Sequence, residues 1–551
     1  MKNAQINGGI DQRKLGLPTK QVVRKDCQKN ALKSPTSCKI VSSVIQIAHS
    51  KFNGDVAFST CFFDAYVSFE GSTFGKGAMF NEATFGKGAR FNEATFGEGA
   101  WFNKATFGEG AWFNKVKFSK DAGFTETTFG KGAWFNKAKF SEHAGFTKAK
   151  FSKGAWFNKV IFSKDAWFTE AKFSKDAEFN KAKFSKGAWF IKAIFSKGAE
   201  FNKAKFSKDA GFTEAKFSKD AGFTEAKFSN GAWFNKAKFS KDAEFNKAKF
   251  SKDAGFTEAK FSNGAEFNKA IFGEGAWFNE AKFSRHARFT GAKFRKDTGF
   301  IGAKFSRHAR FNEATFSGHA GFTGAEFSEG AWFNKAIFGE GAWFIKAIFD
   351  KGAWFIKAIF DKNARFTKAT FSGHTEFEGS KFEGDILTFR GSTFKLAKSQ
   401  EEACRKAKNI LAKAGDREEA GYHFYREMDA KRKQKQWYIR YPEFVFIQSI
   451  FGYGIHPFRL MFCWFLVATA FAIFYSAYEG IISKLPASIL PQPLSYFVEC
   501  FYFSIVTAVT PGYGKYELTS WVYQVVASIE AIFGTFMWAA FIATFARKYM
   551  R

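Results

Sequence analysis

A phenylalanine repeat dominates this sequence, with spacings that alternate between six and five residues from Phe52 to Phe382. The resulting period of eleven residues continues without a break in register. A fixed period of this kind indicates a solenoid, in which similar short units stack on one another. Within each unit, a small residue and phenylalanine alternate with polar positions, which is the two-residue period of short β-strands. The sequence therefore predicts an all-β solenoid over residues 51–395.

Two alternating units make up the repeat, Ala-x-Phe-x-x-x and Ala-x-Phe-x-x, as in residues 204–209 and 210–214. The stretch resembles the pentapeptide-repeat family, which often has leucine at the phenylalanine positions and lacks the extra residue in every second unit. The resemblance implies a right-handed quadrilateral β-helix with four short faces in each coil. Two five-residue faces and two six-residue faces then give a coil of twenty-two residues.

Every eleventh position from Gly77 to His374 holds glycine, aspartate, histidine or asparagine. These residue types tolerate a positive φ angle better than most others. We therefore expect a left-handed corner residue there, just before the inward-facing small residue of the next unit. Five histidines occupy this position, and a corner role is favoured over metal binding, although His286 and His308 would stack one coil apart. They are His143, His286, His308, His319 and His374.

Most of the tryptophans directly precede a core phenylalanine and should therefore point outward. The coil length places Trp112, Trp134 and Trp156 in one column. The favoured interpretation is that such aromatic ladders stabilise an exposed sheet. The alternative is a docking surface for another solenoid or a protein partner.

The net charge of +32 lies mostly on the solenoid, where lysine and glutamate are interleaved. A solvated surface that keeps the solenoid soluble is the favoured interpretation. The alternative is an unknown protein or anionic partner, including an anionic lipid leaflet. Nucleic acid is not favoured, because the charges are mixed along the coils and the chain also carries membrane-length segments.

Three apolar segments follow within residues 441–551. Leu460–Tyr478 has nineteen uncharged residues, enough to cross the roughly 30 Å hydrocarbon core as a helix. A second stretch, from about Leu518 to Ala546, has Glu530 as its only charge. Ser495–Val509 is apolar and aromatic but rather short for a full crossing, which favours a re-entrant pore helix.

The segment Thr510-Pro511-Gly512-Tyr513-Gly514 lies between the short apolar segment and the second span. Its two glycines tolerate the unusual dihedral angles that let consecutive backbone carbonyls face one axis. Carbonyl oxygens in that arrangement can replace the water around a cation. A simple proline-glycine turn is the alternative, but the flanking spans favour an ion-selectivity filter.

Residues 440–551 resemble the two-transmembrane potassium channels of prokaryotes, with helix, pore helix, T-x-G-Y-G and helix in that order. The resemblance implies a homotetramer in the lipid bilayer, in which Thr510 to Gly514 coordinate K⁺ as the transported ion without any other cofactor or metal. Pro511 and Lys515 depart from the family's T-V-G-Y-G-D. Pro511 lacks the N–H that could brace the filter, and four copies of Lys515 would place positive charge at the outer mouth. A weakly selective cation channel is therefore an alternative.

Three further positions in this region have candidate roles. The family often has a glutamate behind the filter, where this chain has Val506. Gly534 matches the place where such channels bend their inner helix, which makes it the gating-hinge candidate. Glu530 is an intramembrane carboxylate, either an ion-path residue or a packing contact with a neighbouring helix.

Basic residues flank the two spans, whereas the loop between them has only Lys484 and Lys515. The positive-inside rule then places both termini in the cytoplasm of a multi-pass protein of the cell membrane. Residues 1–50 lack a signal-peptide core and either cap the solenoid or are partly disordered. Residues 396–440 are predicted to form a helical hairpin linker. The six cysteines have no metal-ligand spacing, and a cytosolic placement favours free thiols.

The sequence shows no catalytic constellation, because the polar residues of the repeat recur uniformly rather than converging, and no enzyme is expected. The favoured function is a tetrameric channel that conducts K⁺ passively, with the solenoid as a cytoplasmic regulatory or interaction domain. The alternative from another class is a membrane-anchored solenoid scaffold that binds a protein or polyanionic partner. The predicted fold is multidomain: a β-solenoid, an α-helical linker and a two-transmembrane α-helical pore domain.

Overall fold

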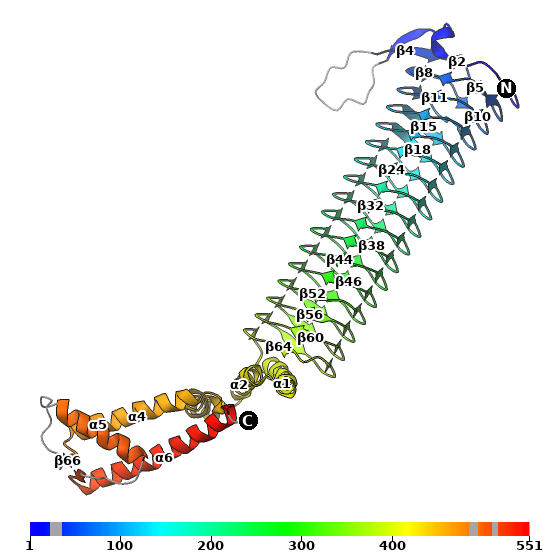
Figure 1. Cartoon of the computed structure of the whole chain (residues 1–551). Helices are drawn as coiled ribbons and strands as arrows, with labels where there is room; N and C mark the ends of the chain where they lie inside the picture. Colours follow the sequence, from blue (N-terminus) through cyan, green and yellow to red (C-terminus); the bar gives the residue numbers. More distant parts are fainter. Residues whose placement is uncertain (23–35, 484–493, 510–515, 550–551) are drawn as a thin grey trace. The chain divides into compact units, whose positions relative to one another are not determined.

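The computed structural model describes residues 1–22, 36–483, 494–509 and 516–549. The chain divides into two compact units, Met1–Leu396 and Ala397–Arg551. The first unit consists of short strands wound into a β-solenoid, and the second consists of helices with one small sheet (Figure 1). The predicted multidomain layout, a solenoid followed by helices, is confirmed.

Most coils of the solenoid contain four two-residue strands separated by turns. In one coil these are β31 (Lys205–Phe206), β32 (Ala210–Gly211), β33 (Lys216–Phe217) and β34 (Ala221–Gly222). Each strand pairs in parallel with the strands of the coils on either side, so Lys205 lies beside Lys183 and Lys227, twenty-two residues away. The predicted coil length is thereby confirmed. The strands run from β1 (Gln5–Ile6) to β65 (Thr393–Phe394), and the longest are β15 (Thr106–Trp112) and β18 (Thr128–Trp134).

Phenylalanine side chains fill the interior of the solenoid. Phe212 is fully buried, and its ring stacks on Phe190 and Phe234 of the adjacent coils at centroid distances of 4.9 and 4.7 Å. The same ring meets Phe201 and Phe223 edge to face, each at 5.4 Å. Both arrangements are favourable for aromatic rings. Each coil is therefore stabilised by its two neighbours, as in other repeat proteins.

The position of the left-handed residue differs from the one predicted. Among the predicted corner residues, which occupy every eleventh position from Gly77 to His374, only Gly88, Gly110 and Gly132 have a positive φ in the described part of the chain. Positive φ angles recur instead at lysine or glutamate on the alternate turn, as at Lys236 (φ 58°). There the Ala237 amide donates to the Phe234 carbonyl at 3.1 Å. Lys236 is thus the third residue of a β-turn, where type II geometry requires a positive φ, and the predicted corner was wrong.

The residues at the predicted corner form contacts with the neighbouring coil instead. The carboxylate of Asp209 accepts a hydrogen bond from the Gly231 amide at 3.1 Å, and Asp253 does the same for Gly275 at 3.1 Å. Glycine precedes the outward tryptophans at this position except at Trp167, which follows Asp165. A Cβ at Gly231, for example, would lie 2.8 Å from the indole nitrogen of Trp233. Contacts with the adjacent coil therefore explain why this position holds glycine or a short side chain that accepts hydrogen bonds, and no positive φ is needed.

Outward-facing rings form columns along the solenoid. Trp134 stacks between Trp112 and Trp156, at centroid distances of 4.0 and 5.0 Å. His286 and His308 also stack, at 5.4 Å. Both columns are as the coil length predicted. Within the described residues there is no group of three or more metal-ligating side chains that could hold a metal ion.

The described part of residues 1–50 adds to the start of the solenoid. In parallel pairing, β1 lies beside β6 (Lys51–Phe52), and β2 (Ile10–Asp11) lies beside β7 (Val56–Ala57). The 3-10 turn η1 (Gln12–Lys14) follows, and then β3 (Thr19–Val22) and β4 (Thr36–Val41) form an antiparallel hairpin. These strands pair with the first repeat coil.

The second unit begins with a helical hairpin of α1 (Ala397–Lys413) and α2 (Arg417–Lys433), as expected from the sequence. Asp416 caps α2, because its carboxylate accepts a hydrogen bond from the Glu419 amide at 3.1 Å. Short helical segments follow: α3 (Trp437–Pro442), the π-helix η2 (Glu443–Ile450) and the 3-10 turn η3 (Gly452–Gly454). The remaining elements are α4 (Pro457–Ala477), β66 (Ile481–Ser483), α5 (Leu494–Val509), β67 (Tyr516–Leu518) and α6 (Trp521–Tyr549).

Four buried or half-buried cysteines in the described part of the chain are free thiols. They are Cys61, Cys404, Cys463 and Cys500. Burial raises the pKa of the Cys61 and Cys404 thiols to about 12, so these two side chains stay protonated at neutral pH. The sixth cysteine, Cys27, lies outside the described residues.

Candidate functional site

Three apolar helices of the second unit frame the candidate site. α4 and α6 each contain a stretch that is long and apolar enough to cross a membrane, Pro457–Ala477 and Trp521–Ala546. α5 has sixteen residues, which is short for a crossing. It packs against both of the longer helices (Figure 1). The two predicted spans and the short helix between them are thus found in the structure.

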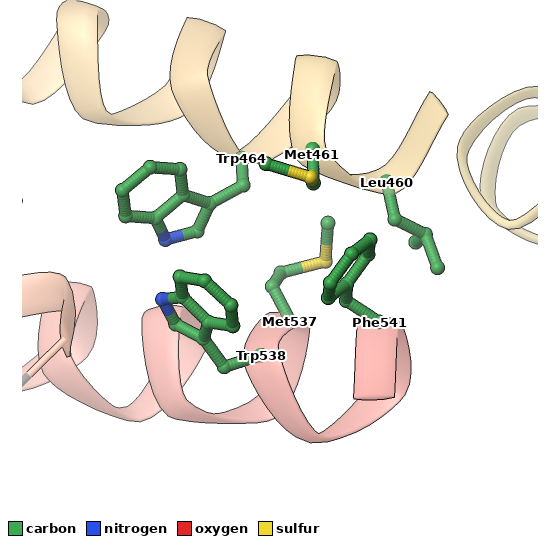
Figure 2. Close-up of a pocket in the computed structure, with 6 residues that line it drawn as sticks. All are labelled: Leu460, Met461, Trp464, Met537, Trp538 and Phe541. Carbon is green, nitrogen blue, oxygen red and sulfur yellow. The ribbon is translucent and has the colours of Figure 1, made fainter. Parts of the chain in front are cut away.

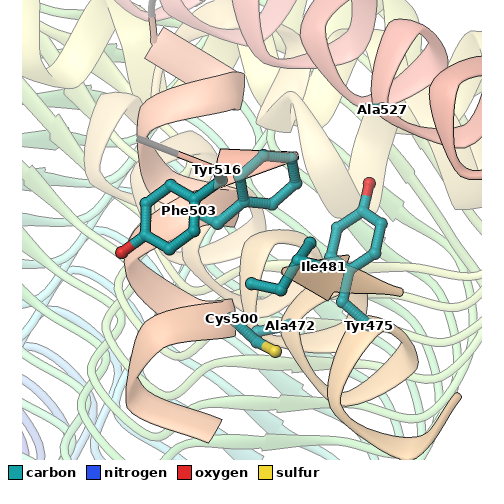
Figure 3. Close-up of a cluster of buried hydrophobic side chains, with 7 residues drawn as sticks. All are labelled: Ala472, Tyr475, Ile481, Cys500, Phe503, Tyr516 and Ala527. Atoms are coloured by element: carbon teal, nitrogen blue, oxygen red, sulfur yellow. The ribbon is translucent and has the colours of Figure 1, made fainter. Parts of the chain in front are cut away.

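A small sheet joins the ends of the two longer helices. β66 follows α4, β67 precedes α6, and they pair antiparallel with Ile482 beside Glu517. Where this sheet meets the helices, a buried cluster forms from Ala472, Tyr475, Ile481, Cys500, Phe503, Tyr516 and Ala527 (Figure 3). Within it, the Tyr516 ring meets the Phe503 ring of α5 at 5.6 Å. The first described residue after the candidate filter is thereby held against the helix that precedes the filter.

The candidate filter, Thr510, Pro511, Gly512, Tyr513 and Gly514, lies outside the described residues, and so does Lys515. Both flanks are described, because Val509 ends α5 and Tyr516 begins β67. The six residues between them connect two elements that contact each other directly. The carbonyl arrangement of the filter stays a prediction.

Gly534 lies where α6 contacts the end of α5. A Cβ at Gly534 would lie 2.6 Å from the Ala508 Cα and would also collide with the Ala508 carbonyl oxygen. Real Cβ atoms do not approach backbone atoms this closely, so only glycine permits the contact. α6 is helical on both sides of this residue, from Trp521 to Tyr549. Close packing therefore explains the glycine, and its role as a gating hinge stays a prediction.

Glu530 lies one turn before Gly534 and is buried between α4, α5 and α6, with 1% of its surface exposed. The Tyr475 hydroxyl donates a hydrogen bond to its Oε2 at 2.9 Å, and Ser504 hydrogen-bonds with its Oε1. Because a single copy of the chain encloses this side chain, the geometry favours the packing role over the ion-path role. Neither hydroxyl was identified from the sequence, since a lone hydroxyl in an apolar helix does not indicate its partner.

α4 and α6 also enclose a small apolar pocket (Figure 2). It is lined by Leu460, Met461, Trp464, Met537, Trp538 and Phe541. The Trp464 and Trp538 rings lie 5.9 Å apart, and neither indole N–H has an acceptor in the described part of the chain. The lining side chains offer neither a charge nor a good cation ligand, so the pocket is not a candidate for ion binding.

A buried polar contact connects the hairpin linker to the segment that precedes α4. Arg432 of α2 donates to the side-chain oxygen of Gln448 at 2.7 Å and to Asp429 at 2.9 Å. Gln448 in turn donates to the Tyr425 hydroxyl at 2.9 Å. The Arg432 guanidinium also lies over the Phe444 ring, 5.0 Å from its centre. The linker therefore has a direct physical connection to the helices that frame the candidate site.

Glu427 of α2 should make the hairpin sensitive to acid. Its buried carboxylate accepts hydrogen bonds from Lys408 of α1 at 2.8 Å and from Lys431 at 2.7 Å. Burial raises the pKa of Glu427, but the two ammonium groups outweigh burial and leave the pKa below its ordinary value of 4.5. A lowered pKa contributes stability above the ordinary value, and this contribution is lost as the pH falls through the lowered value.

We expect Glu427→Gln to destabilise the hairpin by about 1–3 kcal/mol at pH 7, because both lysines lose their charged acceptor. The difference from the unmodified protein should shrink as the pH falls below 4.5. Thermal unfolding followed by circular dichroism at pH 7 and pH 4 measures both effects. Glu401→Gln is the control, because that carboxylate pairs with Arg405 near the surface at 3.3 Å and should contribute less than about 1 kcal/mol. A pH-independent difference would contradict the assignment.

Comparison with known families gives two matches. A family model described as pentapeptide repeats (9 copies) matches the solenoid in overlapping windows, at residues 80–128, 124–172, 157–205, 201–249, 245–293, 278–326, 311–359 and 355–397. A second model, described as ion channel, matches residues 460–551. No curated protein and no solved structure matches the chain.

Proposed function

Because this chain belongs to the pentapeptide-repeat family and carries an ion-channel domain, we propose that it is a homotetrameric potassium channel of the cell membrane. Each subunit contributes α4 and α6 as membrane spans and α5 as the pore helix. Backbone carbonyl oxygens of Thr510 to Gly514 from four copies coordinate K⁺ as it passes. Both termini and the solenoid lie in the cytoplasm, where the solenoid is a regulatory or interaction domain. The proposal includes no catalytic step and no cofactor.

The arrangement of α4, α5 and α6 around the candidate filter is the main support for this proposal. Two membrane-length helices hold a shorter apolar helix between them, and the segment Thr510–Gly514 directly follows that shorter helix. Irregular backbone at membrane depth needs protein or water around it. Four copies around one axis supply protein on the outer side of the segment and water on the inner side, which supports a tetramer.

Ion efflux from liposomes that contain the purified full-length protein tests the proposal. We expect K⁺ efflux that exceeds Na⁺ efflux, and loss of both with Gly512→Ala, because an added Cβ restricts the dihedral angles that the filter needs. Thr469→Ala is the control, since that hydroxyl donates to the Phe465 carbonyl of its own helix and has no other hydrogen-bond partner among the described residues. Similar K⁺ and Na⁺ efflux would favour the weakly selective cation channel. No efflux of either ion would favour the membrane-anchored scaffold.

A column of exposed lysines on the solenoid supports a polyanionic partner as a second role. Five lysines stack in register along one face: Lys216, Lys238, Lys260, Lys282 and Lys304. Only Lys304 pairs with a carboxylate in the described part of the chain, that of Glu326 at 2.9 Å. Lysines in the turns between strands differ, because some of them pair with a glutamate of an adjacent coil, as Lys115 does with Glu93 at 2.7 Å. Like charges stacked side by side are unfavourable unless a partner neutralises them.

Replacing these five lysines by serine should weaken the binding of inorganic polyphosphate by about tenfold or more, since one lysine near an anionic surface contributes about 1 kcal/mol. Titration of the full-length protein in detergent measures the affinity. The control removes five lysines that already pair with glutamate, and therefore changes the net charge equally: Lys115, Lys131, Lys203, Lys236 and Lys252. Equal weakening by both sets would mean that only net charge matters and that this column is not a binding surface.

A further inference from the structure

The hydrogen bonds around Glu530 connect the three apolar helices α4, α5 and α6, which together we call the pore unit. Tyr475 comes from α4, Ser504 from α5 and Glu530 from α6. All three residues are buried, with exposed fractions of 0, 0 and 1%. The Ser504 hydroxyl also lies 2.8 Å from the carbonyl oxygen of Ala468 on α4. A single polar network therefore crosses the apolar interior of the unit.

Counting hydrogens indicates the protonation state of this network. A hydroxyl has one hydrogen, and the Ala468 carbonyl has none, so the 2.8 Å contact uses the Ser504 hydrogen. The contact between Ser504 and Glu530 then needs a hydrogen from the carboxyl group. With a proton on Oε1, Glu530 donates to Ser504, Ser504 donates to Ala468, and Tyr475 donates to Oε2. Three hydrogens then meet three acceptors.

The surroundings of Glu530 agree with a neutral carboxylic acid. No lysine, arginine or histidine among the described residues forms an ion pair with it. A buried carboxylate without a cationic partner is costly, and more so at membrane depth. A neutral acid with both oxygens hydrogen-bonded avoids this cost and can donate as well as accept.

We propose that Glu530, as a neutral carboxylic acid, is a positioning residue that holds the pore helix α5 between the two spans. The inference deepens the proposed channel function and rests on it. Ser504 lies six residues before Thr510, and the Gly534 contact with Ala508 lies one turn further along both helices. α6 therefore contacts α5 at two successive turns, immediately before the filter. These contacts hold the C-terminal end of α5, Val509, to which the filter segment is joined.

The substitution Glu530→Gln tests this proposal most sharply. Glutamine has the shape of the neutral acid, and its amide can donate to Ser504 while its oxygen accepts from Tyr475. We expect K⁺ efflux and the K⁺/Na⁺ efflux ratio of Glu530→Gln to stay within about twofold of the unmodified channel. Glu530→Leu removes both hydrogen bonds at similar volume and should lower the K⁺/Na⁺ ratio by about tenfold or more, since the loss of even one buried hydrogen bond corresponds to roughly that factor.

Two single-atom changes keep the test informative if Glu530→Leu does not assemble. Ser504→Ala and Tyr475→Phe each remove one hydroxyl and should shift the K⁺/Na⁺ ratio in the same direction, by less. Thr469→Ala again serves as the control. A leucine variant with the unmodified ratio, or a glutamine variant as impaired as the leucine variant, would overturn the proposal. The second result would mean that the negative charge is needed.

Infrared difference spectroscopy separates this proposal from the channel function itself. The full-length protein should show the carbonyl stretch of a protonated carboxyl group at pH 7, and Glu530→Gln should lack it. This signal needs no ion flux, so it remains readable if the protein does not conduct. A spectrum with only carboxylate bands would overturn the neutral acid, whereas a protonated band without flux would overturn only the proposed channel function.

Discussion

Replacing Phe212 by alanine is expected to destabilise the solenoid by about 3–5 kcal/mol, the range for removing a fully buried aromatic ring. Phe212 stacks on rings in both adjacent coils and meets two more edge to face. The neighbouring coils can close the cavity only in part, because their backbones are held by the parallel ladders. The loss of unfolding free energy should therefore lie near the upper end of the range found for single substitutions.

Urea unfolding of the full-length protein in detergent, followed by the β-sheet signal in circular dichroism, measures this loss. Two variants serve as controls. Phe212→Leu keeps most of the volume and should cost less than about 1.5 kcal/mol. Lys216→Ala changes an exposed position of the same coil and should stay within about 0.5 kcal/mol. If Phe212→Ala proved as stable as Lys216→Ala, stacked phenylalanines would not be what holds the coils together.

The second large effect is expected from Gly534→Ala, which should reduce K⁺ efflux by about tenfold or more. The added Cβ would meet the backbone of Ala508, which cannot move aside as a flexible side chain can. Inserting a carbon into such a contact typically costs about 1–3 kcal/mol or displaces the neighbouring element. Here the neighbouring element is the end of α5, directly before Thr510.

The thermal stability of the same variant distinguishes packing from hinge bending. Alanine favours a helix by about 1 kcal/mol relative to glycine. A glycine that served only as a hinge would therefore give a more stable protein when replaced. The packing account predicts a lower unfolding temperature instead. Ser528→Thr adds a carbon at an exposed position of α6, where the hydroxyl bonds to the Gln524 carbonyl, and should leave stability and efflux nearly unchanged.

The solenoid was predictable because the period of the sequence repeat determines the length of each coil. A period of eleven with a phenylalanine at every fifth or sixth residue is compatible with few arrangements, and the twenty-two-residue pairing found in the ladders follows from it. The hairpin linker and the spans were predictable for a similar reason. Helix caps such as Asp416 and long uncharged stretches are local signals.

The turns were not predictable from residue preferences alone. Glycine and aspartate suggested a positive φ at one turn, but their positions are explained by contacts with the next coil. The positive φ falls on lysine and glutamate, such as Lys236, although these types disfavour it. Tertiary contacts decide here, because the β-turn and the ladders on both sides determine the backbone geometry.

The polar network of the pore unit could be predicted only in part. Glu530 was identified as a charged type at membrane depth, which is a signal visible in one residue. Its partners Tyr475 and Ser504 lie 55 and 26 residues away in the sequence, so only the packing of the helices brings them together. The same holds for the contact between Gly534 and Ala508, because glycine in an apolar helix does not indicate which element approaches it.

The reversal potential across a bilayer with KCl on one side and NaCl on the other tests the central claim most directly. A tetramer that binds dehydrated K⁺ through the carbonyl oxygens of Thr510 to Gly514 should give a reversal potential close to that of a purely K⁺-permeable membrane. A reversal potential near zero, or no current in a bilayer that demonstrably contains the protein, would contradict it.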